Sequence, residues 1–110
     1  MNKRKWLITE EPHKSLLTNK LANVWWRNIV HQRQWDGLRN EHDLEAMAKK
    51  KMYETSIAKS DMLINLYLEH FEMAGIPLDL DFDTLDAIDA CQSVYKMREI
   101  LHERAGTKTA

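Results

Sequence analysis

The sequence predicts an all-α fold: a three- to four-helix antiparallel bundle with one long central helix, in a single domain over residues 1–110. Glycine occurs three times and proline twice in 110 residues, which is too few turn signals for a sheet of many short strands. Apolar residues recur instead at spacings of three and four, the period of an amphipathic helix. Short connections between such segments favour antiparallel neighbours.

The first helix is expected from about Pro12 to Gln34, after a basic lead-in over residues 1–11. Thr9 is a suitable capping hydroxyl, and proline is favoured in the first turn of a helix. Asp36-Gly37 supplies the break that follows. The apolar face of this helix is formed by Leu16, Leu17, Leu21, Val24, Trp25, Ile29 and Trp35.

The second helix begins between Asn40 and Asp43 and has no proline or glycine until Gly75. Gly75 followed by Pro77 is typical of a helix C-terminus. Ser60-Asp61 is able to restart a helix, so a kink near residues 55–61 is the alternative to one continuous helix over residues 44–75.

The third helix is expected to be capped by Asp81 or Asp83 and to end at Gly106, with residues 107–110 as a flexible tail. The repeated aspartates do not form a calcium loop, because an EF-hand starting at Asp79 needs a glycine and a glutamate where Thr84 and Ala90 stand. The buried stripe of this helix is expected to consist of Leu85, Ile88, Cys91, either Val94 or Tyr95, and Leu101.

Charge is distributed unevenly along the chain. The net charge is −1, yet residues 1–39 carry eight lysines and arginines against three acidic residues. The two remaining thirds, residues 40–75 and 76–110, each carry four basic residues against seven acidic ones. All four tryptophans also fall in the basic third, at positions 6, 25, 26 and 35. This third is therefore the most distinctive part of the sequence.

Tryptophan and arginine together are typical of protein-binding hot spots. Trp25 and Trp26 are adjacent and project about 100° apart on a helix, so both are buried only on a broad face or at an interface. We therefore expect a small protein-binding module, or a regulatory or inhibitory accessory protein of the kind that phages and mobile elements encode. The second copy in a homodimer is the first candidate partner. The expected partner-binding residues are Trp25, Trp26, Arg27, Arg33 and Trp35.

A nucleic-acid-binding regulator is the alternative, because tryptophans stack on bases and cations neutralise phosphates. The acidic remainder of the chain and a pI near 6.5 count against it. Its expected contact residues are Lys3, Arg4, Lys5, Arg27, Arg33 and Arg39.

A magnesium-dependent enzyme is a remote alternative. Glu69-x-x-Glu72 and Asp83-x-x-Asp86-x-x-Asp89 each place carboxylates on one helix face. This set resembles the all-α nucleotide pyrophosphohydrolases, the MazG-like family, whose pattern is ExxE followed by ExxD on a later helix. The resemblance covers about 20 residues and implies a magnesium site between two helices. Here aspartate replaces the leading glutamate of the second pair.

No other motif indicates catalysis or a cofactor. Glu99-x-x-His102 matches half of a diiron-bundle motif, whereas a histidine near the end of an exposed helix explains His102 without a metal. We therefore predict that the protein is not an enzyme and binds neither cofactor nor metal. A single cysteine, Cys91, allows no disulfide within the chain, and no apolar run is long enough to span a bilayer. A cytoplasmic protein without membrane contact is expected.

Overall fold

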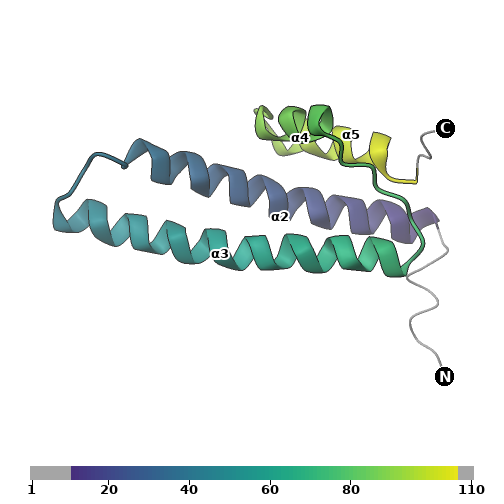
Figure 1. Ribbon diagram of the computed structural model, residues 1–110, viewed down its shortest axis with the longest axis horizontal. Helices are drawn as coiled ribbons and strands as arrows, with labels where there is room; N and C mark the ends of the chain where they lie inside the picture. The colour runs from purple at the N-terminus through teal and green to yellow at the C-terminus, as the bar shows by residue number, and fades with distance from the viewer. Residues whose placement is uncertain (1–10, 107–110) are drawn as a thin grey trace, which may run out of the picture.

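The architecture is an antiparallel helical hairpin with a second, shorter helical pair packed on one side (Figure 1). The structure is a computed structural model that describes residues 11–106, with side chains described from residue 14 onward. The expected tail and all of the lead-in but residue 11 lie outside the described residues. The helices are α2 (Glu11–Gly37), α3 (Leu44–Met73), α4 (Phe82–Asp89) and α5 (Val94–Arg104). This confirms the all-α bundle.

Side-chain contacts fix the directions of the helices. Asn28 and Trp35 of α2 bond to Ser60 and Glu54 of α3, so the two long helices run antiparallel. Asn19 and Asn23 of α2 bond to His102 and Arg98 of α5, which is again antiparallel. α2 thus lies between α3 and the α4–α5 pair, as Figure 1 shows. α3 is the longest helix, and α2 occupies the middle layer.

α3 is continuous through residues 55–61, the segment where a kink was the alternative. Asp43 caps its N-terminus by accepting a hydrogen bond from the Ala46 backbone N–H at 2.8 Å. At the other end Gly75 has a positive φ of 70°, and the backbone N–H groups of Gly75 and Ile76 donate to the carbonyls of Glu72 and Phe71. This is the Schellman arrangement that the Gly75 and Pro77 signal predicts.

The expected single helix after residue 81 is wrong: it is two helices, α4 and α5, separated at residues 90–93. Ser93 starts α5 by accepting a hydrogen bond from the Lys96 backbone N–H. The break shifts the buried face, because α5 begins with a new rotational phase. Met97 is fully buried in α5, whereas Tyr95 is 74% exposed.

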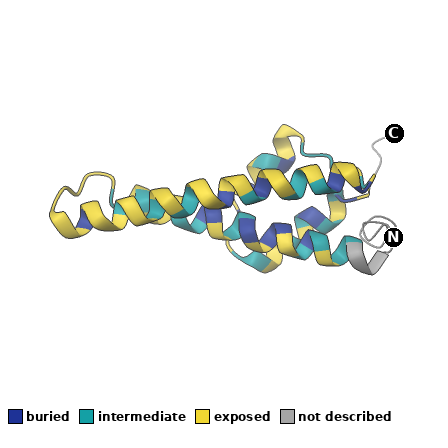
Figure 2. Cartoon of the chain, turned by 90° about the horizontal axis from the view of Figure 1, so that it is seen from below, coloured by how far each residue is buried: buried dark blue, intermediate teal, exposed yellow. Residues whose placement is uncertain are grey.

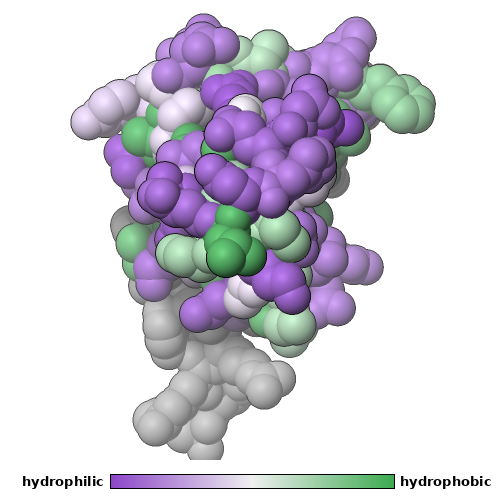
Figure 3. All heavy atoms as spheres, turned by 90° about the vertical axis from the view of Figure 1, so that its left-hand side faces the viewer, coloured by the Kyte–Doolittle hydropathy of each residue, from purple (hydrophilic) through white to green (hydrophobic). Residues whose placement is uncertain are grey.

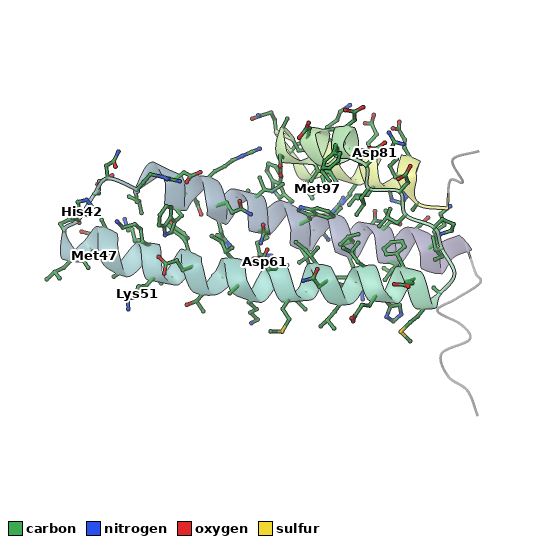
Figure 4. The ribbon with its side chains drawn as sticks, in the orientation of Figure 1. His42, Met47, Lys51, Asp61, Asp81 and Met97 are labelled. Atoms are coloured by element: carbon green, nitrogen blue, oxygen red, sulfur yellow. The ribbon has the colours of Figure 1, made fainter. Side chains whose placement is uncertain are left out.

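The buried core lies at the end of the bundle where three layers meet (Figure 2). Its largest buried side chains come from α2, α3, α4 and α5, and Figure 4 shows Met97 on the side of α5 that faces α2. Beyond this end the α2–α3 hairpin continues without cover, and among its described residues past position 38 only Ala46 is buried before Ser60. The largest fully buried side chains are Thr18, Leu21, Phe71, Ile88, Met97 and Leu101.

Candidate binding groove between α2 and α5

The adjacent tryptophans Trp25 and Trp26 are both half-buried and both pack against the core cluster. They pack against different neighbouring helices. Trp25 precedes Asn28 by three residues and so shares the face of α2 that contacts α3. Trp26 lines the groove toward α5, together with Val94. Both tryptophans are half-buried because α2 has a neighbouring helix on each side: α3 covers Trp25 and α5 covers Trp26.

Arg33 connects Trp26 to the corner between α4 and α5. Its guanidinium carbon lies 5.6 Å from the centre of the Trp26 ring. The same guanidinium, through Nη2, donates hydrogen bonds to the backbone carbonyls of Asp89 at 2.8 Å and Cys91 at 2.7 Å. These carbonyls lie at the end of α4, where carbonyls lack helical partners and a cation is favourable. Arg33 therefore holds the corner and stacks on Trp26 at once.

An open groove of about 360 Å³ runs between α2 and the start of α5. Trp26 and Val30 give it an apolar wall, and Val94 closes the opposite side. Arg27 lies at the lip with an exposed side chain, and within the described part of the chain it makes no hydrogen bond or ion pair. The groove residues are Asn23, Trp26, Arg27, Val30 and Val94.

Trp35 lies apart from this groove, nine residues and about 13 Å farther along α2. Its indole N–H donates to Glu54 of α3 at 3.0 Å, and the Arg39 guanidinium lies 5.3 Å from its ring. Arg39 also pairs with Asp36 at 2.7 Å. Of the five expected partner-binding residues, the structure brings together Trp26, Arg27 and Arg33 and places Trp25 and Trp35 on the α3 side.

The expected nucleic-acid contacts are dispersed. Lys3, Arg4 and Lys5 lie outside the described residues. Arg33 and Arg39 are engaged with backbone carbonyls and with Asp36, respectively. Arg27 is the member of this set that is described and has no partner within residues 14–106.

A polar cluster in the α2–α3 interface was missed by sequence analysis. The Asn28 amide nitrogen lies within hydrogen-bond distance of the Ile57 carbonyl, Ser60 Oγ and Asp61 Oδ1, at 2.8 to 3.3 Å. Gln32 donates to the Asn28 side-chain oxygen. Figure 4 shows Asp61 on the side of α3 that faces α2. Asn28 and Ser60 are both buried, so the cluster fixes the register of the hairpin.

The acidic residues of the described chain do not converge on a metal site. No group of three or more histidine, cysteine or acidic side chains within residues 14–106 is placed to hold a metal ion. Asp81 instead caps α4 by accepting a hydrogen bond from the Thr84 backbone N–H at 2.8 Å, as the sequence predicts. His102 is half-buried and bonds to Asn19 at 2.9 Å, so it joins α5 to α2.

Two titratable side chains near the α4–α5 pair have altered acidity. The hydroxyl and the backbone N–H of Thr84 lower the pKa of the Asp81 carboxyl. Of these two groups the backbone N–H forms the hydrogen bond, since Thr84 Oγ1 has no partner in the described structure. Burial raises the pKa of the Cys91 thiol, against the opposing effect of Arg33 and Lys96. Cys91 is 3% exposed, which confirms that it belongs to the core stripe.

Residues outside the expected set complete the groove. Asn23 and Val30 share the helix face of Trp26 and Arg27, since each lies three or four residues from both the tryptophan and the arginine. Val94 joins them only because α5 crosses α2 at this level, so its place in the groove has no signal in the sequence. None of the described helices combines the length and the apolar character that crossing a membrane requires. Comparisons with protein-family models, with curated proteins and with solved structures found no match to this chain.

Proposed function

We propose that the protein is a helical protein-binding module and that the groove between α2 and α5 is its contact surface. One observation carries the proposal: a half-buried tryptophan, Trp26, lies at the same groove as Arg27, which has no partner among the described residues. Binding energy in protein interfaces is concentrated in such residues when a pocket surrounds them. A regulatory or inhibitory role follows if the bound partner loses access to another protein.

Trp26 is suited to the role because its ring is held in place before any partner binds. Arg33 covers one region of the ring and is itself anchored by two backbone carbonyls. A preorganised aromatic side chain loses little conformational entropy on binding, so more of the contact energy contributes to affinity.

The chemistry of the groove specifies the kind of partner. The wall formed by Trp26, Val30 and Val94 accepts an apolar side chain. Arg27 at the lip offers a guanidinium to a carboxylate, which it binds with two parallel hydrogen bonds. The expected partner is therefore an acidic segment of another protein with an apolar anchor residue, presented as a helix or an extended strand.

Nucleic acid is the competing partner, and the described cations support it less. Phosphate binding needs several unpaired cations along one surface. Arg33 and Arg39 already have acceptors within the chain. Among the described arginines of this set, Arg27 is therefore the one available to bind a phosphate, and a single cation gives weak binding to nucleic acid.

The test is a selection of peptides from a random displayed library on the full-length chain, with amide chemical shifts mapping where the selected peptides bind. We expect selected peptides to combine acidic and large apolar residues and to perturb Asn23, Val30 and Val94. Arg27→Glu should weaken their binding about tenfold or more, because it places like charges together. Lys20→Glu is the matched control, since Lys20 is also an exposed cation of α2 and lies outside the groove.

Two outcomes contradict the proposal. One is a set of selected peptides whose shifts map away from the groove. The other is that duplex DNA or RNA binds at micromolar concentration, with an affinity that falls steeply between about 50 and 200 mM salt and drops equally for Arg27→Glu and Lys20→Glu. Equal effects of the two substitutions identify diffuse phosphate binding, whereas a loss confined to Arg27→Glu identifies a groove contact.

A further inference from the structure

The outer face of α3, opposite the face that packs on α2, carries a stripe of large apolar side chains in solvent. Met52 is 66% exposed, Met62 64%, Leu66 53% and Met73 63%. Met52, Leu66 and Met73 are spaced by multiples of seven residues, and Met62 lies four residues before Leu66. Such spacing places side chains on one face of a helix that pairs with another helix. Figure 2 views the molecule from the α3 side and shows this helix largely exposed.

The stripe continues through polar positions at the same spacing. Thr55, Lys59 and Glu69 fill its remaining positions between Met52 and Met73, and all three are exposed. Neither Lys59 nor Glu69 forms a hydrogen bond or ion pair within the described residues. The stripe thus carries one cation and one anion, neither of them paired within the described residues. Their positions determine which orientation of a second helix would bring opposite charges together.

We propose that this outer face of α3 is a self-association surface, on which the α3 helix of a second copy packs antiparallel in a twofold dimer. Lys59 and Glu69 lie five residues before and five residues after Ile64. An antiparallel pair centred at Ile64 therefore sets each Lys59 opposite Glu69 of the other copy. The same register sets Met62 opposite Leu66 and Thr55 opposite Met73.

A parallel pair is disfavoured by the same two charges. In register it would set Lys59 against Lys59 and Glu69 against Glu69, and like charges across a helix pair are destabilising. The antiparallel arrangement pairs each Lys59 with Glu69 and each Met62 with Leu66 of the other copy around a single twofold axis. It therefore meets the requirement that an interface between identical copies be self-complementary.

The inference does not rest on the proposed function, because the two surfaces lie on opposite sides of the molecule. α2 separates α3 from α5, so the groove stays open when two α3 helices pack together (Figure 1). The dimer would present two grooves facing away from each other. A single helix from each copy gives an interface at the small end of the range for specific complexes, so the expected dissociation constant is about 1–100 µM.

The test is sedimentation equilibrium of the full chain at about 1–500 µM, a range that brackets the expected constant. The wild-type chain should pass from monomer to dimer over this range. Leu66→Lys should leave it monomeric, and Lys59→Glu or Glu69→Lys should raise the dissociation constant about tenfold or more, because each puts like charges in contact. All three positions are exposed, so circular dichroism should show unchanged helix content.

Charge reversal at both positions identifies the register. The double variant Lys59→Glu/Glu69→Lys restores opposite charges across the antiparallel pair and should recover dimerisation to within about threefold of wild type. An equimolar mixture of the two single variants should form a heterodimer for the same reason. Lys20→Glu, on α2, is the charge-matched control and should leave the dimer unchanged.

The proposal is overturned if the wild-type chain is monomeric throughout the concentration range, or if Leu66→Lys and Lys59→Glu dimerise as the wild type does. A dimer that Lys59→Glu weakens and the double variant does not restore overturns the antiparallel register. Arg27→Glu should not alter dimerisation, and Leu66→Lys should not alter binding of the selected peptides. Failure of one proposal is therefore distinguishable from failure of the other.

Discussion

The two ends of the α2–α3 hairpin are formed by the same pair of helices and are stabilised by different interactions. At the end near Phe71 the hairpin is covered by the α4–α5 pair, and apolar side chains from all three layers are buried there. At the tip, near residues 38–58, no other described helix covers the two helices. Seen from the tip, the surface is mainly hydrophilic with scattered apolar side chains (Figure 3).

The tip is maintained by polar contacts instead of burial. Lys50 donates to the Glu41 carbonyl, Trp35 donates to Glu54, and Asp43 caps α3. Figure 4 shows His42, Met47 and Lys51 around this end, away from the α4–α5 pair. Exposed polar contacts contribute little to stability, each about 0–1 kcal/mol for an ion pair, so the tip is expected to open before the covered end.

The largest effect is expected from a cavity in the covered end. Phe71→Ala should lower the free energy of unfolding by about 3–5 kcal/mol, because Phe71 is 1% exposed and neighbouring side chains refill its space only in part. Leu44→Ala at the tip should cost less than about 0.5 kcal/mol, since Leu44 is already in solvent. Urea denaturation followed by circular dichroism measures both. Equal losses would show that the tip is packed as tightly as the covered end.

Asn28 lies where the two regions meet. Asn28→Ala should cost about 1–3 kcal/mol, because it removes the buried amide that bonds to Ser60 and Asp61. It should also accelerate amide hydrogen exchange in residues 50–60 more than in residues 64–71. Gln34→Ala is the control, as Gln34 is an exposed residue of α2 whose side chain makes no hydrogen bond within the described residues. If exchange accelerates uniformly along α3, the hairpin unfolds as one unit and the proposed division is incorrect.

Arg33 secures the corner of the covering pair. Arg33→Ala should destabilise the protein by about 1–2 kcal/mol, since the carbonyls of Asp89 and Cys91 lose a charged donor. The Cys91 thiol should then react faster with a thiol reagent, because the corner that buries it is loosened. Arg33→Lys should recover little, since an ammonium lacks the planar fork of a guanidinium. Unchanged thiol reactivity in Arg33→Ala would argue that burial of Cys91 is independent of Arg33.

The smallest effect concerns the acid sensitivity of the cap on α4. The pKa of Asp81 is lowered in the folded state, so its contribution to stability is complete above the unfolded value of about 3.9 and is lost as the pH falls through the folded value. Asp81→Asn keeps a capping side chain without this titration. The difference in melting temperature between wild type and Asp81→Asn should therefore change below about pH 4 and stay constant from pH 5 to 8. A constant difference at all pH values would contradict the assignment.

The local signals in the sequence predicted much of the fold. The limits of α3 followed from Asp43 and from Gly75 with Pro77, since capping is decided within a few residues. α2 was expected to end near Gln34 and extends to Gly37, since Gly37 does not adopt the positive φ that Gly75 adopts after α3. These elements required no knowledge of distant contacts.

The break between α4 and α5 and the groove depend on distant contacts. Residues 90–93 contain neither glycine nor proline, and Ser93 was the only capping signal there. The carbonyls freed by the break are satisfied by Arg33, more than fifty residues earlier in the chain. Of the five residues expected to bind a partner, the fold brings Trp26, Arg27 and Arg33 together and places Trp25 and Trp35 toward α3. Whether they bind a partner stays a prediction.

The base of the α4–α5 pair is closed by contacts between its two ends. Leu78 and Ala105 form an antiparallel backbone bridge, and the Gly106 N–H donates to the Pro77 carbonyl at 2.6 Å. Residues 78–105 are therefore a loop whose ends are joined independently of α2 and α3. We expect a loop closed in this way to leave the hairpin as a unit, because its ends are joined to each other by backbone contacts. If the protein were pulled by its two ends, the backbone contacts of Leu78 with Ala105 and of Gly106 with Pro77 would therefore bear the force first. The helices α4 and α5 would bear it only after these contacts break.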